Sequence, residues 1–167
     1  MNSSQSQLSS AGAWAMGLLF MLVGLVPLLV GLGVLAPTYA DPDTAPRWVL
    51  VCAGLMFMAA GLAIALDYGI AGGMAPDGDL PAGTPLSIRA ANLALGLTIL
   101  GLMTAIFGWI AFGPGPRHFS TTFSVLLLPA AQAGRISAAS GRVVFGGATV
   151  LLALMFVVCG ILGATRL

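Results

Sequence analysis

The sequence contains no lysine and no glutamate, and it carries little charge of either sign. Its charged residues are six arginines and five aspartates, 7% of the 167 residues, whereas a soluble domain carries about 25%. Such a chain cannot cover a folded domain with a surface compatible with water. With a net charge of +1 and no basic run, nothing supports nucleic-acid binding or electrostatic docking to anionic lipid.

Histidine and cysteine are also scarce. His118 is the single histidine, and one histidine alone does not supply the three or four ligands of a usual metal site. No Gly-x-Ser-x-Gly turn accompanies it to form a hydrolase triad. Because it falls in a loop, a contact with a lipid head group or a neighbouring subunit is favoured over the alternative of a haem ligand. Cys52 and Cys159 are expected at opposite membrane faces, too far apart for a disulfide. The sequence therefore predicts no enzyme, no cofactor and no metal.

Long apolar stretches take up most of the chain, which is 59% hydrophobic with a mean hydropathy of +1.04. A helix that crosses a bilayer needs roughly 20 apolar residues. Four stretches meet that length, at residues 13–35, 47–66, 87–112 and 143–164. Together with three loops they fill residues 1–167, which predicts a single integral-membrane domain. The predicted fold class is an all-α membrane protein with four transmembrane helices packed as a bundle.

The segment between the third and fourth stretches predicts a short interfacial helix followed by a second helical piece. Ser120 begins a polar run that leads into Phe123 and the apolar residues after it. Pro129 then opens an alanine-rich run to Ser140, and proline is well placed in the first turn of a helix.

Small residues recur every seven positions within the apolar stretches. In lipid, helices associate through the close backbone approach that small residues permit. A seven-residue period keeps such a seam facing its partner along a left-handed crossing. The predicted packing seam consists of Gly17, Gly24, Gly31, Gly54, Gly61, Ala94, Gly101, Gly108, Gly146, Ala153 and Gly160, with Ala91, Thr98 and Ala105 flanking it in the third stretch.

No acid or base is expected at mid-membrane depth, where an ionisable residue would indicate a functional site. The most polar side chains expected there are Asn92, Thr98, Thr104 and Thr149, for which hydrogen bonds between helices are favoured over substrate binding. Asp67 and Arg89 are placed at the two helix ends that flank the second loop. We interpret them as an interfacial ion pair contributing about 1 kcal/mol or less; the alternative is a gate or a partner-docking site.

The distribution of arginine predicts the orientation, because cytoplasmic loops carry an excess of positive charge. Loops one and three share one side of the membrane and hold four arginines, against two on the other side. These are Arg47, Arg117, Arg135 and Arg142 against Arg89 and Arg166. Loops one and three are therefore predicted to be cytoplasmic, with both termini on the non-cytoplasmic side. Arginine without lysine, beside abundant alanine and glycine, indicates a GC-rich bacterial gene and hence the inner (plasma) membrane.

Three features predict a non-catalytic protein. The sequence has no recognisable catalytic or metal-binding motif, its segments outside the membrane are short, and it has more small-residue surface than one four-helix core needs. We expect an accessory or structural subunit of a membrane complex. Its partners would be the lipid bilayer and another integral-membrane protein or a second copy of itself, and not nucleic acid. The alternative hypothesis is a small channel or a carrier of lipid or another small molecule. It would use glycine-lined space between helices, the Pro27 kink, and a polar cavity near Asn92, Thr98 or Thr104.

Overall fold

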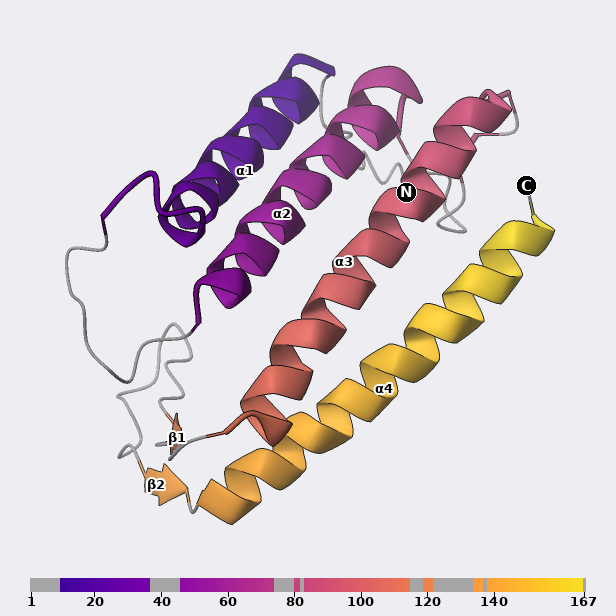
Figure 1. Cartoon of the computed structure of the whole chain (residues 1–167). Helices are drawn as coiled ribbons and strands as arrows, with labels where there is room; N and C mark the ends of the chain where they lie inside the picture. Colours follow the sequence, from indigo (N-terminus) through magenta and orange to yellow (C-terminus); the bar gives the residue numbers. More distant parts are fainter. Residues whose placement is uncertain are drawn as a thin grey trace, which may run out of the picture.

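Four long helices form most of the structure, a computed structural model (Figure 1). The helices are α1 (Ser10–Gly31), α2 (Arg47–Ile64), α3 (Leu86–Phe112) and α4 (Ala138–Thr165). A π-helix, η1 (Ala65–Ile70), directly continues α2, and two short strands, β1 (Phe119–Thr121) and β2 (Gly134–Ile136), pair antiparallel. The structure describes residues 10–36, 46–73, 80–81, 83–114, 119–121, 134–136 and 138–166. The four helical spans are long and apolar enough to cross a membrane, as the lengths of the four apolar stretches predict.

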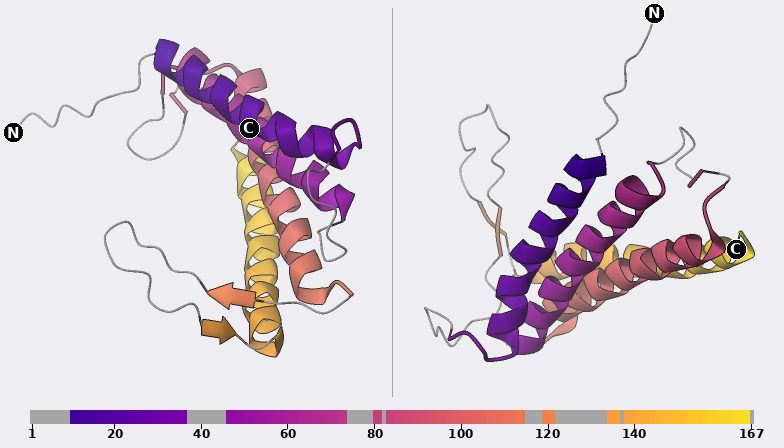
Figure 2. Two further views of the ribbon diagram at one scale, coloured as in Figure 1. Left: turned by 90° about the vertical axis from the view of Figure 1, so that its left-hand side faces the viewer. Right: turned by 90° about the horizontal axis from the view of Figure 1, so that it is seen from above.

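The helices lie in one layer and run alternately up and down (Figure 1). Each helix packs on its neighbour in chain order, α1 on α2, α2 on α3 and α3 on α4. Among the described residues α1 and α4 share no substantial contact, so the layer is open at its two edges. Figure 2 shows the α1–α2 pair crossing the α3–α4 pair at an angle.

The two ends of the layer differ in what they hold. The termini end, as we call it, holds the start of α1, the end of η1, the start of α3 and the end of α4. The hairpin end holds the end of α1, the start of α2, the end of α3, the start of α4 and the β1–β2 pair. At the hairpin end, Trp48 of α2 meets Trp109 of α3 edge to face, with ring centroids 6.1 Å apart. Such pairs contribute about 0.5–1.5 kcal/mol beyond their buried area.

Some helix boundaries differ from the predicted ones, and at the end of α1 the cause is the backbone conformation of a glycine. α1 ends at Gly31 rather than at residue 35, because Gly33 takes a left-handed conformation with φ of 76°. The N–H groups of Gly33 and Val34 donate to the carbonyls of Val30 and Leu29, the pattern of a glycine-terminated helix. α4 begins at Ala138, five residues before the predicted start at residue 143.

The prediction of a helix from Pro129 to Ser140 is wrong over Gly134–Ile136, which form β2. Ser120 pairs with Arg135 in the β1–β2 ladder, so the polar run before the expected interfacial helix is a strand, and that helix itself, from Phe123, lies outside the described residues. Glycine disfavours helix, while phenylalanine, threonine and isoleucine favour strands, and this composition explains the difference. Residues 122–133 lie outside the described part of the chain.

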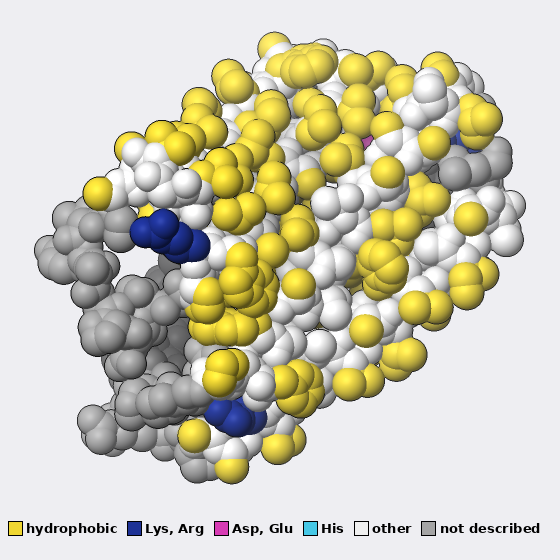
Figure 3. Space-filling view, viewed as in Figure 1, with side chains coloured by type: hydrophobic (Ala, Val, Ile, Leu, Met, Phe, Trp, Pro, Cys, Tyr) yellow, Lys and Arg dark blue, Asp and Glu magenta, His cyan; other side chains and the backbone are white. Residues whose placement is uncertain are grey.

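The interior contains small residues. In α1 the buried residues are Ala13, Gly17, Gly24 and Gly31, and in α2 they are Val49, Gly54, Ala59 and Gly61. No described large side chain is fully buried, and α1 and α4 turn leucine, valine and isoleucine outward. Figure 3 shows the face of the molecule seen in Figure 1, with apolar side chains over its middle and arginine side chains toward its ends.

Candidate functional site

The contact between α1 and α2 is a line of glycines at which the two backbones touch. A Cβ placed on Gly17 would lie 2.6 Å from the carbonyl oxygen of Gly61, and one placed on Gly24 would lie 2.7 Å from that of Gly54. The relationship is reciprocal, since Cβ atoms on Gly54 and Gly61 would meet the carbonyl oxygens of Gly24 and Gly17. Only glycine permits this approach, and its Cα hydrogens then point at carbonyl oxygens of the other helix.

This close contact extends along the pair to the hairpin end. A Cβ on Gly31 would lie 2.8 Å from the carbonyl oxygen of Arg47 and 2.7 Å from Cγ2 of Val51. Beside the glycines, Phe20 and Phe57 pack with ring centroids 6.2 Å apart. α1 and α2 therefore form one tightly packed unit.

The contact between α3 and α4 is made by side chains. A Cβ on Gly101 would lie 3.5 Å from the ring of Phe156, and one on Gly108 would lie 3.5 Å from Cγ2 of Thr149. These are ordinary van der Waals distances, with no backbone of the other helix so close. Gly146 has Phe112 at 3.4 Å from the same position, and Gly160 has Leu97 at 3.8 Å. The glycines of the predicted seam thus lie at backbone contacts in α1 and α2 but at looser side-chain contacts in α3 and α4, while Ala94 of the seam is exposed.

One face of α3 exposes only small side chains. Ala94, Thr98 and Ala105, at helical spacing, are exposed, and we call them the α3 small face. The exposed large apolar residues of α3 are at its two ends, Leu86 and Phe112. The hydroxyl of Thr98 donates to the carbonyl of Ala94 at 2.8 Å, so the face offers no unmatched donor. Gly101 falls on the same face and meets Phe156, which places the small face beside α4.

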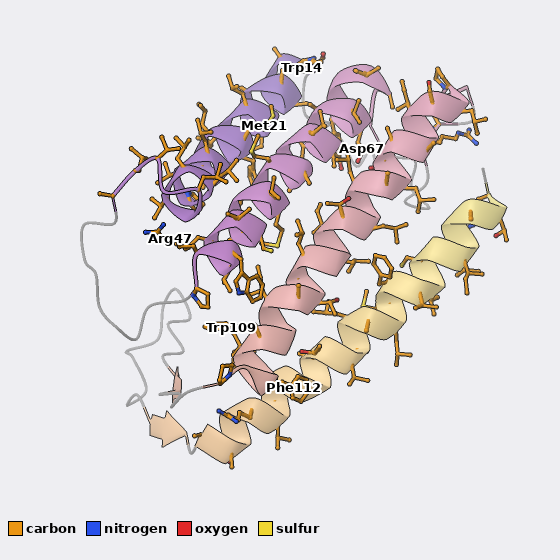
Figure 4. All side chains as sticks on the ribbon, viewed as in Figure 1. Trp14, Met21, Arg47, Asp67, Trp109 and Phe112 are labelled. Atoms are coloured by element: carbon orange, nitrogen blue, oxygen red, sulfur yellow. The ribbon has the colours of Figure 1, made fainter. Side chains whose placement is uncertain are left out.

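Asp67 is a buried acid that the sequence interpretation missed. It was expected at a helix end facing the second loop, but η1 extends the second helix to Ile70 and leaves Asp67 only 4% exposed. Figure 4 shows Asp67 on the side of this helix that faces α3, at the termini end. Its Oδ1 has no hydrogen-bond partner. The sequence did carry one signal for this burial: the residues after Asp67, up to Ile70, are compatible with a longer second helix.

The π-helix around Asp67 is held by the start of α1. Trp14 covers Gly69, where a Cβ would lie 2.9 Å from the indole Nε1, and the hydroxyl of Ser10 donates to the Gly69 carbonyl at 3.4 Å. The N–H of Ala71 donates to the carbonyl of Leu66 at 2.9 Å, the five-residue spacing of a π turn. Single π turns in helices are rare, and those that occur are often found at functional sites.

Arg89 in the first turns of α3 is held by the backbone that precedes it. Its Nη2 donates to the carbonyl oxygen of Pro81 at 3.2 Å. An ion pair between Asp67 and Arg89 is not among the contacts of the described residues.

A cavity of about 580 Å³ lies between α3 and α4 at the termini end. Its polar lining comes from Arg89 and Asn92 of α3 and Arg166 of α4. Away from the arginines the lining is apolar and includes Leu97, Leu100 and Leu162, the last of which is exposed. None of the described residues that line it is acidic. A second cavity of about 510 Å³ lies at the hairpin end between Phe112 and Arg142.

The expected polar residues within the spans mostly bond to their own helices. The hydroxyls of Thr104 and Thr149 donate to the carbonyls of Leu100 and Phe145 at 2.7 and 2.8 Å, as Thr98 does to Ala94. Of the three residues expected to approach a cavity, Asn92 lines one and Thr98 and Thr104 line neither.

His118 lies outside the described residues, as do all the aspartates except Asp67. In the described part of the chain, no group of three or more His, Cys, Asp or Glu side chains could hold a metal ion. Cys52 is half-buried, Cys159 is exposed, and both are free thiols.

Four long apolar helices, small residues at their contacts and arginines at their ends have the composition of a multi-pass membrane protein. Neither a protein-family model, nor a curated protein, nor a solved structure matches the chain.

Proposed function

We propose that the four helices span a bilayer and that the chain is a non-catalytic subunit of a membrane complex. A helix of another integral-membrane protein, or of a second copy, would lie on the α3 small face. By its composition the membrane is the inner membrane of a bacterium, with loops one and three in the cytoplasm and both termini on the other side.

The observation that supports this proposal is the contrast between exposed faces. Between Ser87 and Phe112, α3 exposes only Ala94, Gly96, Thr98 and Ala105, whereas α1 and α4 expose large apolar side chains along their length. Large apolar side chains suit contact with lipid tails, while small ones let another helix approach its backbone. A helix on the small face would lie beside α4 and complete a bundle that this chain leaves open.

The test is the mass of the complex extracted in mild detergent. We expect native mass spectrometry to find a species heavier than the 16.8 kDa chain. Replacing Ala105 with leucine should return the chain to a monomer, because the added side chain keeps the partner helix away from an exposed face. The matched control is Val158→Leu at an exposed position of α4, which should preserve the complex. A parent chain that is monomeric, without a co-purifying protein, would contradict the proposal.

A second candidate is the lipid-handling branch of the alternative hypothesis, which the cavity between α3 and α4 favours. Its lining combines two arginines with a largely apolar interior, which suits an amphiphile. A water-filled channel is less well supported, because Thr98, Thr104 and Thr149 direct their hydroxyls to carbonyls of their own helices.

A further inference from the structure

We propose that the cavity between α3 and α4 at the termini end binds one anionic phospholipid. Arg89 and Arg166 would hold its phosphate, and the apolar part of the cavity would hold an acyl chain. This inference rests on the second candidate function and specifies its ligand; it is independent of the docking of a partner on the α3 small face.

The cavity is amphiphilic along its length. On α3 the lining residues Arg89, Asn92, Leu93, Gly96, Leu97 and Leu100 follow helical spacing, so one helix face runs from a charged end into an apolar interior. On α4, Cys159, Leu162, Gly163 and Arg166 do the same in the opposite chain direction. Because the helices are antiparallel, both arginines come to the termini end. A ligand with a charged head and an apolar tail matches this arrangement.

The charge of the lining selects an anion. Among the described residues of the lining the charged ones are Arg89 and Arg166, and guanidinium groups bind phosphate through paired hydrogen bonds. Arg89 also lies in the first turn of α3, where the helix dipole favours negative charge over positive. Its bond to the Pro81 carbonyl fixes the guanidinium at the polar end of the cavity. An anion there would be attracted by both arginines and by the start of α3.

The space in the cavity fits a chain-like ligand. The volume of about 580 Å³ lies within the range of roughly 300–1,000 Å³ typical of ligand sites. Gly96 is exposed, and a Cβ there would have nothing within 4 Å, so the cavity is open to the outside of the bundle beside this glycine. With the helices across a bilayer, the ends of α3 and α4 lie at head-group depth. A phospholipid could therefore enter from the surrounding bilayer with its phosphate already at the level of the arginines.

The experiment titrates the full-length protein in detergent with single lipids and counts bound lipid by native mass spectrometry. The probes are dioleoyl phosphatidylglycerol, dioleoyl phosphatidylcholine and oleate. We expect one phosphatidylglycerol per chain, bound about tenfold or more tightly than phosphatidylcholine, because its head group carries a net negative charge whereas the choline cation offsets the phosphate charge of phosphatidylcholine. Equal binding of the two phospholipids would show non-selective lipid contact and overturn the proposal. Tighter binding of oleate would overturn the choice of a phospholipid.

Variants locate the binding within the cavity. Arg89→Gln and Arg166→Gln should each weaken phosphatidylglycerol binding about tenfold, while Arg47→Gln, at the hairpin end and outside both cavities, should not. Gly96→Leu keeps both charges, fills open space and should also weaken binding. Unchanged binding in Gly96→Leu would place the lipid outside the cavity. The same spectra report the mass of the complex, so loss of lipid and loss of a protein partner are read separately.

Discussion

The carbonyl oxygen of Gly54 lies 2.7 Å from the position that a Cβ on Gly24 would occupy, and the carbonyl oxygen of Gly24 lies 2.7 Å from the corresponding position on Gly54. Each glycine thus leaves room for the backbone of the other helix. A side chain at either position would meet a rigid helix backbone, so α1 and α2 would have to move apart. The corresponding positions in α3 and α4 meet the ends of side chains, which can adjust.

Gly24→Ala and Gly54→Ala should therefore lower stability, each by about 1–3 kcal/mol, the usual cost of overpacking. Gly101→Ala should have a much smaller effect, because its Cβ would contact the Phe156 ring at an ordinary 3.5 Å. The measurement is thermal unfolding in detergent, followed by circular dichroism.

Gly96→Ala is the control for the loss of glycine itself. Its Cβ would have nothing within 4 Å, and alanine favours helix over glycine by about 1 kcal/mol, so stability should stay the same or rise. If Gly24→Ala unfolds at the temperature of Gly96→Ala, the glycine line does not hold α1 and α2 together.

Cysteine labelling in intact cells tests the topology. In a chain with Cys52 and Cys159 replaced by alanine, a cysteine at Gly83 should react with a membrane-impermeant thiol reagent, whereas one at Ala36 should not. Both positions are exposed, and they lie at opposite ends of the helix layer, Gly83 at the termini end. The reverse labelling pattern would invert the orientation predicted from arginine. Labelling at both positions would rule out a membrane crossing by the single span between them, α2 with η1.

Asp67→Asn should raise stability by about 1 kcal/mol or more, because a neutral amide costs less to bury than a carboxylate of the same shape with one oxygen that lacks a hydrogen-bond partner. The aspartate is 4% exposed and its Oδ1 has no hydrogen-bond partner. An acid retained at such a cost would point to a role in function rather than in folding. Thermal unfolding of the parent and the variant at neutral pH measures the difference.

Lower stability in Asp67→Asn would instead favour the ion pair with Arg89 expected from the sequence. A double-mutant cycle with Arg89→Gln separates the two cases. Independent effects would mean that the side chains do not interact, whereas a coupling energy of about 0.5 kcal/mol or more would show that they do.

The number and approximate position of the long helices could be predicted from the sequence, because apolar runs of about 20 residues or more form few structures other than membrane-spanning helices. The start of α3 was expected within one residue, since Pro85 precedes it. The end of α1 was missed because the effect of Gly33 depends on its backbone conformation, with φ of 76°. Strand β2 was missed because its partner, β1, is distant in sequence.

The candidate sites were less accessible to sequence reasoning. The seven-residue repeat predicts the same kind of helix contact in all four helices. Backbone meets backbone at Gly24 and Gly54, however, and not at Gly101. That difference depends on which residues of the neighbouring helix come opposite. Asp67 was expected at the end of the second helix, because the continuation of that helix as η1 is a π turn, which has no clear sequence signal. The cavity between α3 and α4 required the relative placement of two helices.

Crosslinking in native membranes tests the central claim, that another membrane helix lies on the α3 small face. A photoreactive amino acid at Ala105 should give a crosslinked product heavier than the single chain, because this exposed position would face the partner. The same amino acid at Leu22, 54% exposed on α1, should face lipid and give none. Crosslinks from Leu22 but not from Ala105, or from neither position, would contradict the account.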